Sequence, residues 1–141
     1  MIQRPKSIAL FQLFYSAYAL VGFGGSYLAL TRNAEIQAIN VDGGGWLIPV
    51  SLVAPLLIAA LIWFFVVRQA SQVAAWIATL LFVINLAASA VALLRWQDGA
   101  ADGVALALGL VATFFFLLAV IMLWRGETLA WFSTARTKGR V

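Results

Sequence analysis

Hydrophobic residues in this chain gather in four long runs, and short polar segments separate them. The runs extend over residues 8–30, 46–67, 73–94 and 104–124, and none contains Asp, Glu, Lys or Arg. Each is close to the roughly 20 residues that an α-helix needs to cross about 30 Å of hydrocarbon. The pattern predicts an all-α membrane protein, a four-transmembrane-helix bundle in which residues 1–141 form a single membrane domain.

The first run follows Arg4 and Lys6, as the apolar part of a secretory signal peptide follows its basic start. The run is longer than the roughly 7–15 residues of such a segment, and no A-x-A-like cleavage site stands near its end. We therefore interpret it as the first membrane span.

The predicted spans place successive connecting segments on alternate sides of the membrane. Lysine and arginine are distributed unequally between these two sides. The side of the chain ends has seven of them, and the other side has only Arg32 and Arg95. The positive-inside rule then predicts that both termini and the turn 68–72 are cytoplasmic, and that the loops 31–45 and 95–103 face outward. The seven are Arg4, Lys6, Arg68, Arg125, Arg136, Lys138 and Arg140.

Tryptophan positions agree with this orientation, because the amphipathic indole ring prefers the depth of the lipid head groups. No tryptophan falls near the middle of a predicted span. Trp46 and Trp96 map to the outer side, and Trp63, Trp76, Trp124 and Trp131 map to the cytoplasmic side.

The two outward loops are interpreted as connectors whose charged residues cap the neighbouring helices. Arg32 and Arg95 each end a span, where a cation complements the negative end of the helix dipole. Asp42 and Asp102 each precede a span, where an acidic group favours a helix N-terminus. If the acidic residues of both loops converged, they would form a carboxylate cluster able to hold a cation, which is a less favoured alternative.

Composition narrows the classes of function. The chain is 65% hydrophobic and 10% charged, which excludes a soluble globular protein. It contains no Cys and no His, and this excludes thiol and imidazole chemistry, metal–thiolate sites and haem with an axial His. Serine and threonine inside the spans have no His or carboxylate beside them, so we predict neither an enzyme nor a bound cofactor or metal.

Two of the runs carry small and polar residues at helical spacing, which predicts the faces turned toward the bundle interior. For Asn85 the favoured expectation is an interhelical hydrogen bond of about 0.6 kcal/mol, and a contact with a solute is the alternative. Gly22 with Ser26, and Ala105 with Gly109 in the fourth run, are spaced for close helix packing. The faces consist of Ala74, Ala78, Phe82, Asn85, Ser89 and Ala92 in the third run, and of Gln12, Tyr15, Ser16, Ala19, Gly22, Phe23 and Ser26 in the first.

Pro55 lies inside the second run, whereas Pro49 lies in its first turn. An interior proline removes a backbone hydrogen bond to the carbonyl of Ser51, and the Ser51 hydroxyl or a neighbouring helix can satisfy the local backbone instead. We expect a static kink that shapes the bundle, and a gating hinge is the alternative.

The segment 125–141 is a basic tail with an apolar patch. It suits contact with anionic lipid head groups at the cytoplasmic face, at about 1 kcal/mol per basic residue, or with an acidic partner protein. Nucleic acid is not expected as a partner, because the topology already explains the few positive charges. The contact residues are predicted to be Arg125, Trp131, Arg136, Lys138 and Arg140.

The opening Arg4-Pro5-Lys6-Ser7-Ile8, which leads directly into an apolar run, resembles many small four-helix bacterial membrane proteins that have no assigned activity. Together with the plan of four spans, the resemblance implies a location in the bacterial cytoplasmic (inner) membrane. It implies no functional residue.

Two functions fit these features. The favoured one is a non-enzymatic accessory or packing subunit that associates with another membrane protein, or with itself, through small-residue helix faces. The alternative is a small-solute channel or transporter that works as an oligomer and lines its path with polar residues. These residues are Gln12, Tyr15, Ser16, Ser51 and Asn85.

Overall fold

The computed structural model of the protein describes residues 5–99 and 102–138, with side chains as far as residue 135. These residues form six α-helices: α1 (Lys6–Arg32), α2 (Ala34–Asp42), α3 (Leu47–Val67), α4 (Gln72–Gln97), α5 (Gly103–Leu123) and α6 (Gly126–Lys138). The helices α1, α3, α4 and α5 are long and apolar enough to cross a membrane. The four predicted spans are thus confirmed as helices, and their ends lie within three residues of the predicted ones.

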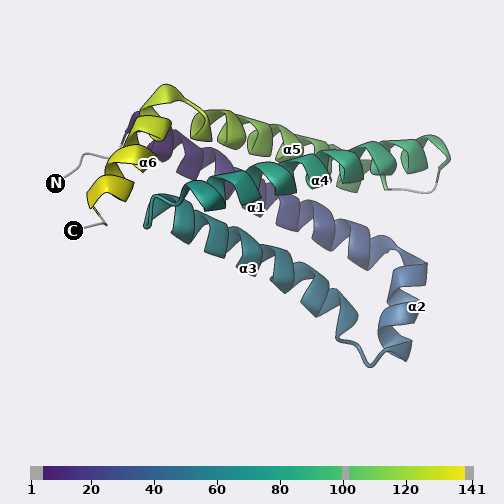
Figure 1. Ribbon diagram of the computed structural model, residues 1–141. Helices are drawn as coiled ribbons and strands as arrows, with labels where there is room; N and C mark the ends of the chain where they lie inside the picture. The colour runs from purple at the N-terminus through teal and green to yellow at the C-terminus, as the bar shows by residue number, and fades with distance from the viewer. Residues whose placement is uncertain (1–4, 100–101, 139–141) are drawn as a thin grey trace.

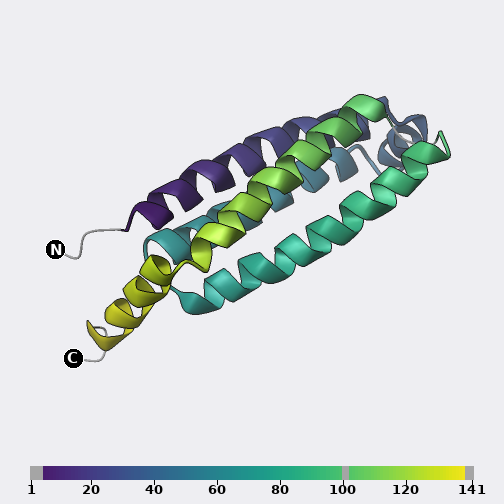
Figure 2. The same cartoon turned by 90° about the horizontal axis from the view of Figure 1, so that it is seen from above.

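The four long helices run alongside one another, and the two short helices lie at opposite ends of them (Figure 1). Helix α2 lies across one end, where it joins α1 to α3. Helix α6 lies at the other end, close to the start of α1, and Figure 2 shows the same arrangement from above. We call these the α2 end and the α6 end.

The apolar core occupies the half of the bundle near the α6 end. Tyr15 of α1 stacks on Phe11 and meets Phe116 of α5 edge to face, with ring centroids 5.1 and 5.7 Å apart. Phe82 of α4 meets the same Phe116 ring at 5.5 Å. Aromatic side chains from three helices therefore fill this half. The buried core residues are Ile8, Phe11, Tyr15, Ile62, Val66, Val67, Ala74, Ala75, Ala78, Phe116, Ala119, Val120, Leu123 and Phe132.

Helices α1 and α5 stay close toward the α2 end, because glycines of α1 face α5 there. A Cβ placed at Gly25 would lie 3.2 Å from Leu108 Cβ and 3.4 Å from the backbone nitrogen of Gly109. A Cβ at Gly22 would lie 3.6 Å from Ala112 Cβ. Small residues in α1 thus allow the close approach that the spacing of small residues predicts, although Gly25 makes the tighter contact.

Helices α3 and α4 separate from one another toward the α2 end (Figure 1). Part of the predicted inward face of α1 does not face the packed interior. Tyr15 is buried, but Ser16, Phe23 and Ser26 are exposed. These three line hollows between α1 and α3, where no helix packs tightly enough to cover them.

The prediction of a plain connector between α1 and α3 is wrong, because this segment contains α2. The Asn33 side chain starts α2 by accepting hydrogen bonds from two backbone N–H groups of its first turn, at 3.0 and 3.2 Å. Asp42 ends α2 instead of preceding α3, so its predicted place at a helix N-terminus is wrong too. At the start of α3 it is Asn40 that binds a backbone N–H group, because its Oδ1 accepts a hydrogen bond of 3.0 Å from the N–H of Ile48.

Candidate functional site

At the α2 end the four long helices line a partly open hollow instead of a core. Its main part, the central groove, is a cavity of about 390 Å³. Ligand pockets typically measure about 300–1,000 Å³, so the space is large enough for a small molecule or a lipid chain. The lining residues are Tyr18, Ala19, Gly22, Phe23, Gly25, Ser26 and Ala29 of α1; Ser51, Leu52, Pro55, Leu56 and Ala59 of α3; Asn85, Ala88, Ser89 and Ala92 of α4; and Ala105, Gly109 and Ala112 of α5.

A second cavity of about 360 Å³, the rim pocket, lies beside the ends of α1 and α4 and the start of α5. It shares five small residues with the central groove, so the two cavities adjoin: Ala29, Ser89, Ala92, Ala105 and Gly109. Its other lining residues are Arg32, Asn33, Ile36, Arg95, Asp102, Leu106 and Leu110. The rim pocket thus combines charged groups with apolar walls.

A polar cluster joins α4 to α5 beside the central groove. Thr113 Oγ1 lies 2.8 Å from Asn85 Oδ1, 2.8 Å from Ser89 Oγ and 2.9 Å from the carbonyl oxygen of Gly109. A threonine hydroxyl has one proton, so Thr113 donates to one of these oxygens at a time. Either hydroxyl can be the donor between Thr113 and Ser89, because Ser89 Oγ also lies 2.9 Å from the backbone carbonyl oxygen of Asn85. The interhelical partner expected for Asn85 is therefore Thr113.

The amide nitrogen of Asn85 faces accessible space. Among the described residues, every buried side-chain nitrogen or oxygen has a hydrogen-bond partner. The Asn85 oxygen is bonded to Thr113, but within the same residues its NH₂ group has no partner. Because Asn85 is half-buried and lines the central groove, this NH₂ presents two donors to the hollow.

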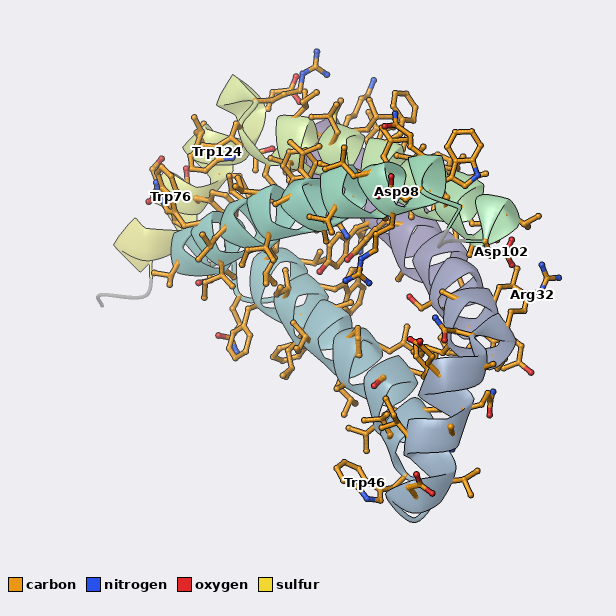
Figure 3. The ribbon with its side chains drawn as sticks, turned by 90° about the vertical axis from the view of Figure 1, so that its right-hand side faces the viewer. Arg32, Trp46, Trp76, Asp98, Asp102 and Trp124 are labelled. Atoms are coloured by element: carbon orange, nitrogen blue, oxygen red, sulfur yellow. The ribbon has the colours of Figure 1, made fainter. Side chains whose placement is uncertain are left out.

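Arg32 of α1 and Asp102, which precedes α5, form an ion pair at the rim. Arg32 Nη1 lies 2.8 Å from Asp102 Oδ2, and Figure 3 shows the two side chains pointing toward one another. Asp102 Oδ1 also accepts a hydrogen bond of 2.9 Å from the N–H of Val104, as a helix-capping residue does. The Arg32 guanidinium first, and then this backbone N–H, hold the pKa of the Asp102 carboxyl below its ordinary value.

The acidic residues of the two loops do not converge. Glu35, Asp42, Asp98 and Asp102 are all described, and no group of three or more His, Cys, Asp or Glu residues within the described part of the chain could hold a metal ion. In Figure 3, Asp98 lies over α4 and apart from the Arg32–Asp102 pair. The alternative of a carboxylate cluster is therefore wrong.

The other residues singled out in the spans lie in several places. Gln12 is half-buried and lines neither the central groove nor the rim pocket, and Ser16 lines a smaller cavity of about 230 Å³ between α1 and α3. Ser51 and Pro55 line the central groove, and α3 continues without interruption through Pro55. The structure thus brings Ser51, Pro55, Asn85, Ser89, Gly22, Ser26 and Gly109 together around one groove, and it places Gln12, Tyr15 and Ser16 outside that groove.

The basic tail forms α6, which packs on the start of α1. Thr128 is fully buried, and its Oγ1 lies 2.8 Å from Ser7 Oγ and 2.9 Å from the carbonyl oxygen of Met122. Phe132 belongs to the core, Trp131 is half-buried, and Arg125 is exposed. Arg136 and Lys138 lie in the last turns of α6, and Arg140 lies outside the described residues.

Sequence reasoning missed Thr113, Thr128 and the pairing of Arg32 with Asp102. For Thr113 a signal existed, since it is the one hydroxyl-bearing residue in the whole of α5. A hydroxyl in an otherwise apolar span needs a partner on a neighbouring helix.

The searches for related proteins found no matching family model, curated protein or solved structure.

Proposed function

We propose that this chain is a non-enzymatic, multi-pass membrane protein of the bacterial inner membrane, and that it acts as an accessory subunit by associating with another membrane protein or with a second copy of itself. The four apolar helices and the resemblance of the opening residues support this location. We place the α6 end in the cytoplasm, because Lys6, Arg68 and Arg125 lie there.

The observation that carries the proposal is the free face of α4. In the most apolar 18-residue stretch of α4, 6% of the residues are buried. The corresponding share is 22% for α1, 22% for α3 and 28% for α5. Residues on one side of α4 alternate at spacings of three and four, which is the repeat of left-handed helix pairs, and all of them are exposed. They are Val73, Leu80, Val83, Ala87, Ala90 and Leu94, together with Trp76, whose ring also meets that of Trp124 at 4.5 Å.

Ala87 and Ala90 place small side chains on the part of this face near the α2 end. Membrane helices gain their association energy from close packing, because lipid tails are as apolar as the helices themselves. A face with small side chains between larger aliphatic ones is suited to such packing. The partner is therefore expected to be another membrane helix.

Purification in a mild detergent tests the proposal. The chain should be recovered with a stoichiometric partner, identified by mass spectrometry, or as a defined oligomer by light scattering. Replacing Ala87 and Ala90 together by leucine should abolish that association, whereas Ala107→Leu, at an exposed alanine of α5, should preserve it. A monomer without a partner would contradict the proposal.

The orientation has its own test, because the chain contains no cysteine. Single-cysteine variants Asp42→Cys and Arg136→Cys should react with a membrane-impermeant maleimide from opposite sides of the membrane. If the same side labels both positions, the assigned orientation is wrong.

A second candidate, a small-solute channel or transporter working as an oligomer, draws on one observation, the Asn85 NH₂ group at the central groove. Toward the α6 end the groove adjoins the cavity of about 230 Å³, with which it shares Ala19, Leu56 and Ala59, and the aromatic core lies in the same half of the bundle. Liposomes containing the purified protein should show solute flux that Asn85→Leu removes. Absence of flux from the unmodified protein counts against this candidate.

A further inference from the structure

The rim pocket contains one more positive than negative charge. Its charged side chains are Arg32, Arg95 and Asp102, and Arg32 is already bonded to Asp102 at 2.8 Å. Across residues 5–99 and 102–135, no acidic side chain forms an ion pair with Arg95. A guanidinium beside apolar walls favours an anion, and its planar set of N–H donors matches the oxygens of a phosphate.

The central groove that continues from the rim is largely apolar. Ala88 and Ala92 of α4 leave space, and Leu52 and Leu56 of α3 line the opposite wall. Asn85 lies ten residues before Arg95, which corresponds to about 15 Å along the helix. The polar side chain of Asn85 therefore limits how far an apolar chain can extend into the groove from Arg95. A ligand that fills both cavities is therefore anionic at one end and apolar along its length.

The divergence of α3 and α4 determines where such a ligand comes from. Helices α3 and α4 separate toward the α2 end (Figure 1). Both line the groove, which is only half enclosed, so its open side lies between them. In the bilayer assumed above, that opening faces hydrocarbon, and an empty space there would deprive its walls of van der Waals contacts. An acyl chain fills the space without leaving the membrane, and Arg95 in the last turn of α4 lies near the head groups of the same leaflet.

We propose that the rim pocket and the central groove together bind one anionic phospholipid, with its phosphate at Arg95 and the remaining N–H donors of Arg32, and with one acyl chain in the groove. The site lies at the α2 end, far from the basic tail. It depends on membrane insertion, but not on association through α4, so lipid binding and oligomeric state are separate measurements.

Native mass spectrometry of the full chain tests the head-group contact. The protein is released from bilayers that contain equal amounts of phosphatidylglycerol and phosphatidylcholine, and the lipid that remains bound is identified. One phosphatidylglycerol per chain should be retained. Arg95→Gln should lower its retention about fivefold, the effect expected for one basic residue at a lipid surface. Arg68→Gln, at an exposed arginine of the opposite end, should leave retention unchanged.

A second pair of variants tests the chain contact. A Cβ at Gly109 or at Gly24 would meet no atom within 4 Å, but Gly109 lines both cavities and Gly24 lines neither. Gly109→Leu should therefore fill the junction of the two cavities and abolish lipid retention. Gly24→Leu makes the same substitution in α1 without entering the groove, and it should bind lipid as the unmodified chain does.

Three results would overturn the proposal. Equal retention of phosphatidylcholine would exclude recognition of the anionic head group. Equal losses in Arg95→Gln and Arg68→Gln would show attraction to general surface charge. Displacement of the lipid by millimolar inorganic phosphate, with unchanged binding in Gly109→Leu, would show a site for free anions instead of a lipid. Circular dichroism of each variant verifies that its helices form.

Discussion

Thr128 of α6 and Ser7 of α1 are 121 residues apart in the chain, and their hydroxyl oxygens lie 2.8 Å apart in the core of the α6 end. Both side chains are buried, with 0% and 1% of their surface exposed. The Met122 carbonyl oxygen lies 2.9 Å from Thr128 Oγ1 and completes the chain of hydrogen bonds. This contact ties the last helix to the first, and so it connects both ends of the described chain.

Replacing Thr128 by valine, which has the same shape, should loosen α6. The variant leaves the buried Ser7 hydroxyl and the Met122 carbonyl without their partner, and a buried unsatisfied group costs about 1–3 kcal/mol. Thermal unfolding in detergent should report this loss, together with faster trypsin cleavage after Arg125. Thr134→Val is the matched control, because Thr134 is exposed on the same helix and should change stability by less than about 0.5 kcal/mol. Equal stability of the two variants would contradict the assigned role of Thr128.

Two adjacent glycines of α1 should respond to alanine in opposite ways. At Gly25 a Cβ would lie 3.2 Å from Leu108 Cβ and 3.5 Å from the carbonyl oxygen of Ala105, so α1 and α5 must separate slightly. Overpacking of this kind costs about 1–3 kcal/mol. At Gly24 a Cβ meets nothing within 4 Å, and alanine there should stabilise the helix by about 0.5–1 kcal/mol. Unfolding midpoints of Gly25→Ala and Gly24→Ala that shift in the same direction would contradict the close contact of α1 with α5.

The four long helices were predictable because each must be apolar over its full length, so hydropathy alone locates them. Helix α2 was not predicted, because residues 31–45 include three consecutive glycines and were interpreted as a connector. A local signal was present all the same: Asn33 precedes Glu35 in the way that a capping residue precedes the first turn of a helix. Asp42 was misplaced for the same reason, since Asp-Gly occurs at the end of a helix as well as before one.

The hollow at the α2 end could be predicted only in part. Helical spacing identified Asn85 and Ser89 as members of one face, and this face does line the groove. The divergence of α3 from α4 is a relationship between two whole helices, which no local pattern encodes. Arg32 and Asp102 each had a sufficient local explanation as a capping residue, and nothing in their surroundings along the chain indicated a partner 70 residues away.

The contact between Asn85 and Thr113 should appear as a coupling energy in a double-mutant cycle. Their oxygens are 2.8 Å apart across the interface of α4 and α5. Interhelical hydrogen bonds in membranes contribute about 0.6 kcal/mol and at most about 1.7 kcal/mol, so Asn85→Ala and Thr113→Val should be less than additive by that amount. Ser51→Ala combined with Thr113→Val is the control pair, because no hydrogen bond joins these described residues. Coupling of the same size in the control pair would rule out a direct bond as the cause.

The ion pair of Arg32 with Asp102 should give the protein an acid-dependent loss of stability. Because Arg32 lowers the pKa of the Asp102 carboxyl in the folded protein, the ionised group stabilises the fold above the pKa of the unfolded chain. This contribution disappears as the pH falls through the lowered pKa. Arg32→Gln should raise the pKa of Asp102 and reduce the dependence of the unfolding midpoint on pH in the acid range, whereas Arg68→Gln at the far end should retain it. Identical pH profiles for the unmodified chain and Arg32→Gln would show that the pair does not couple the end of α1 to the start of α5.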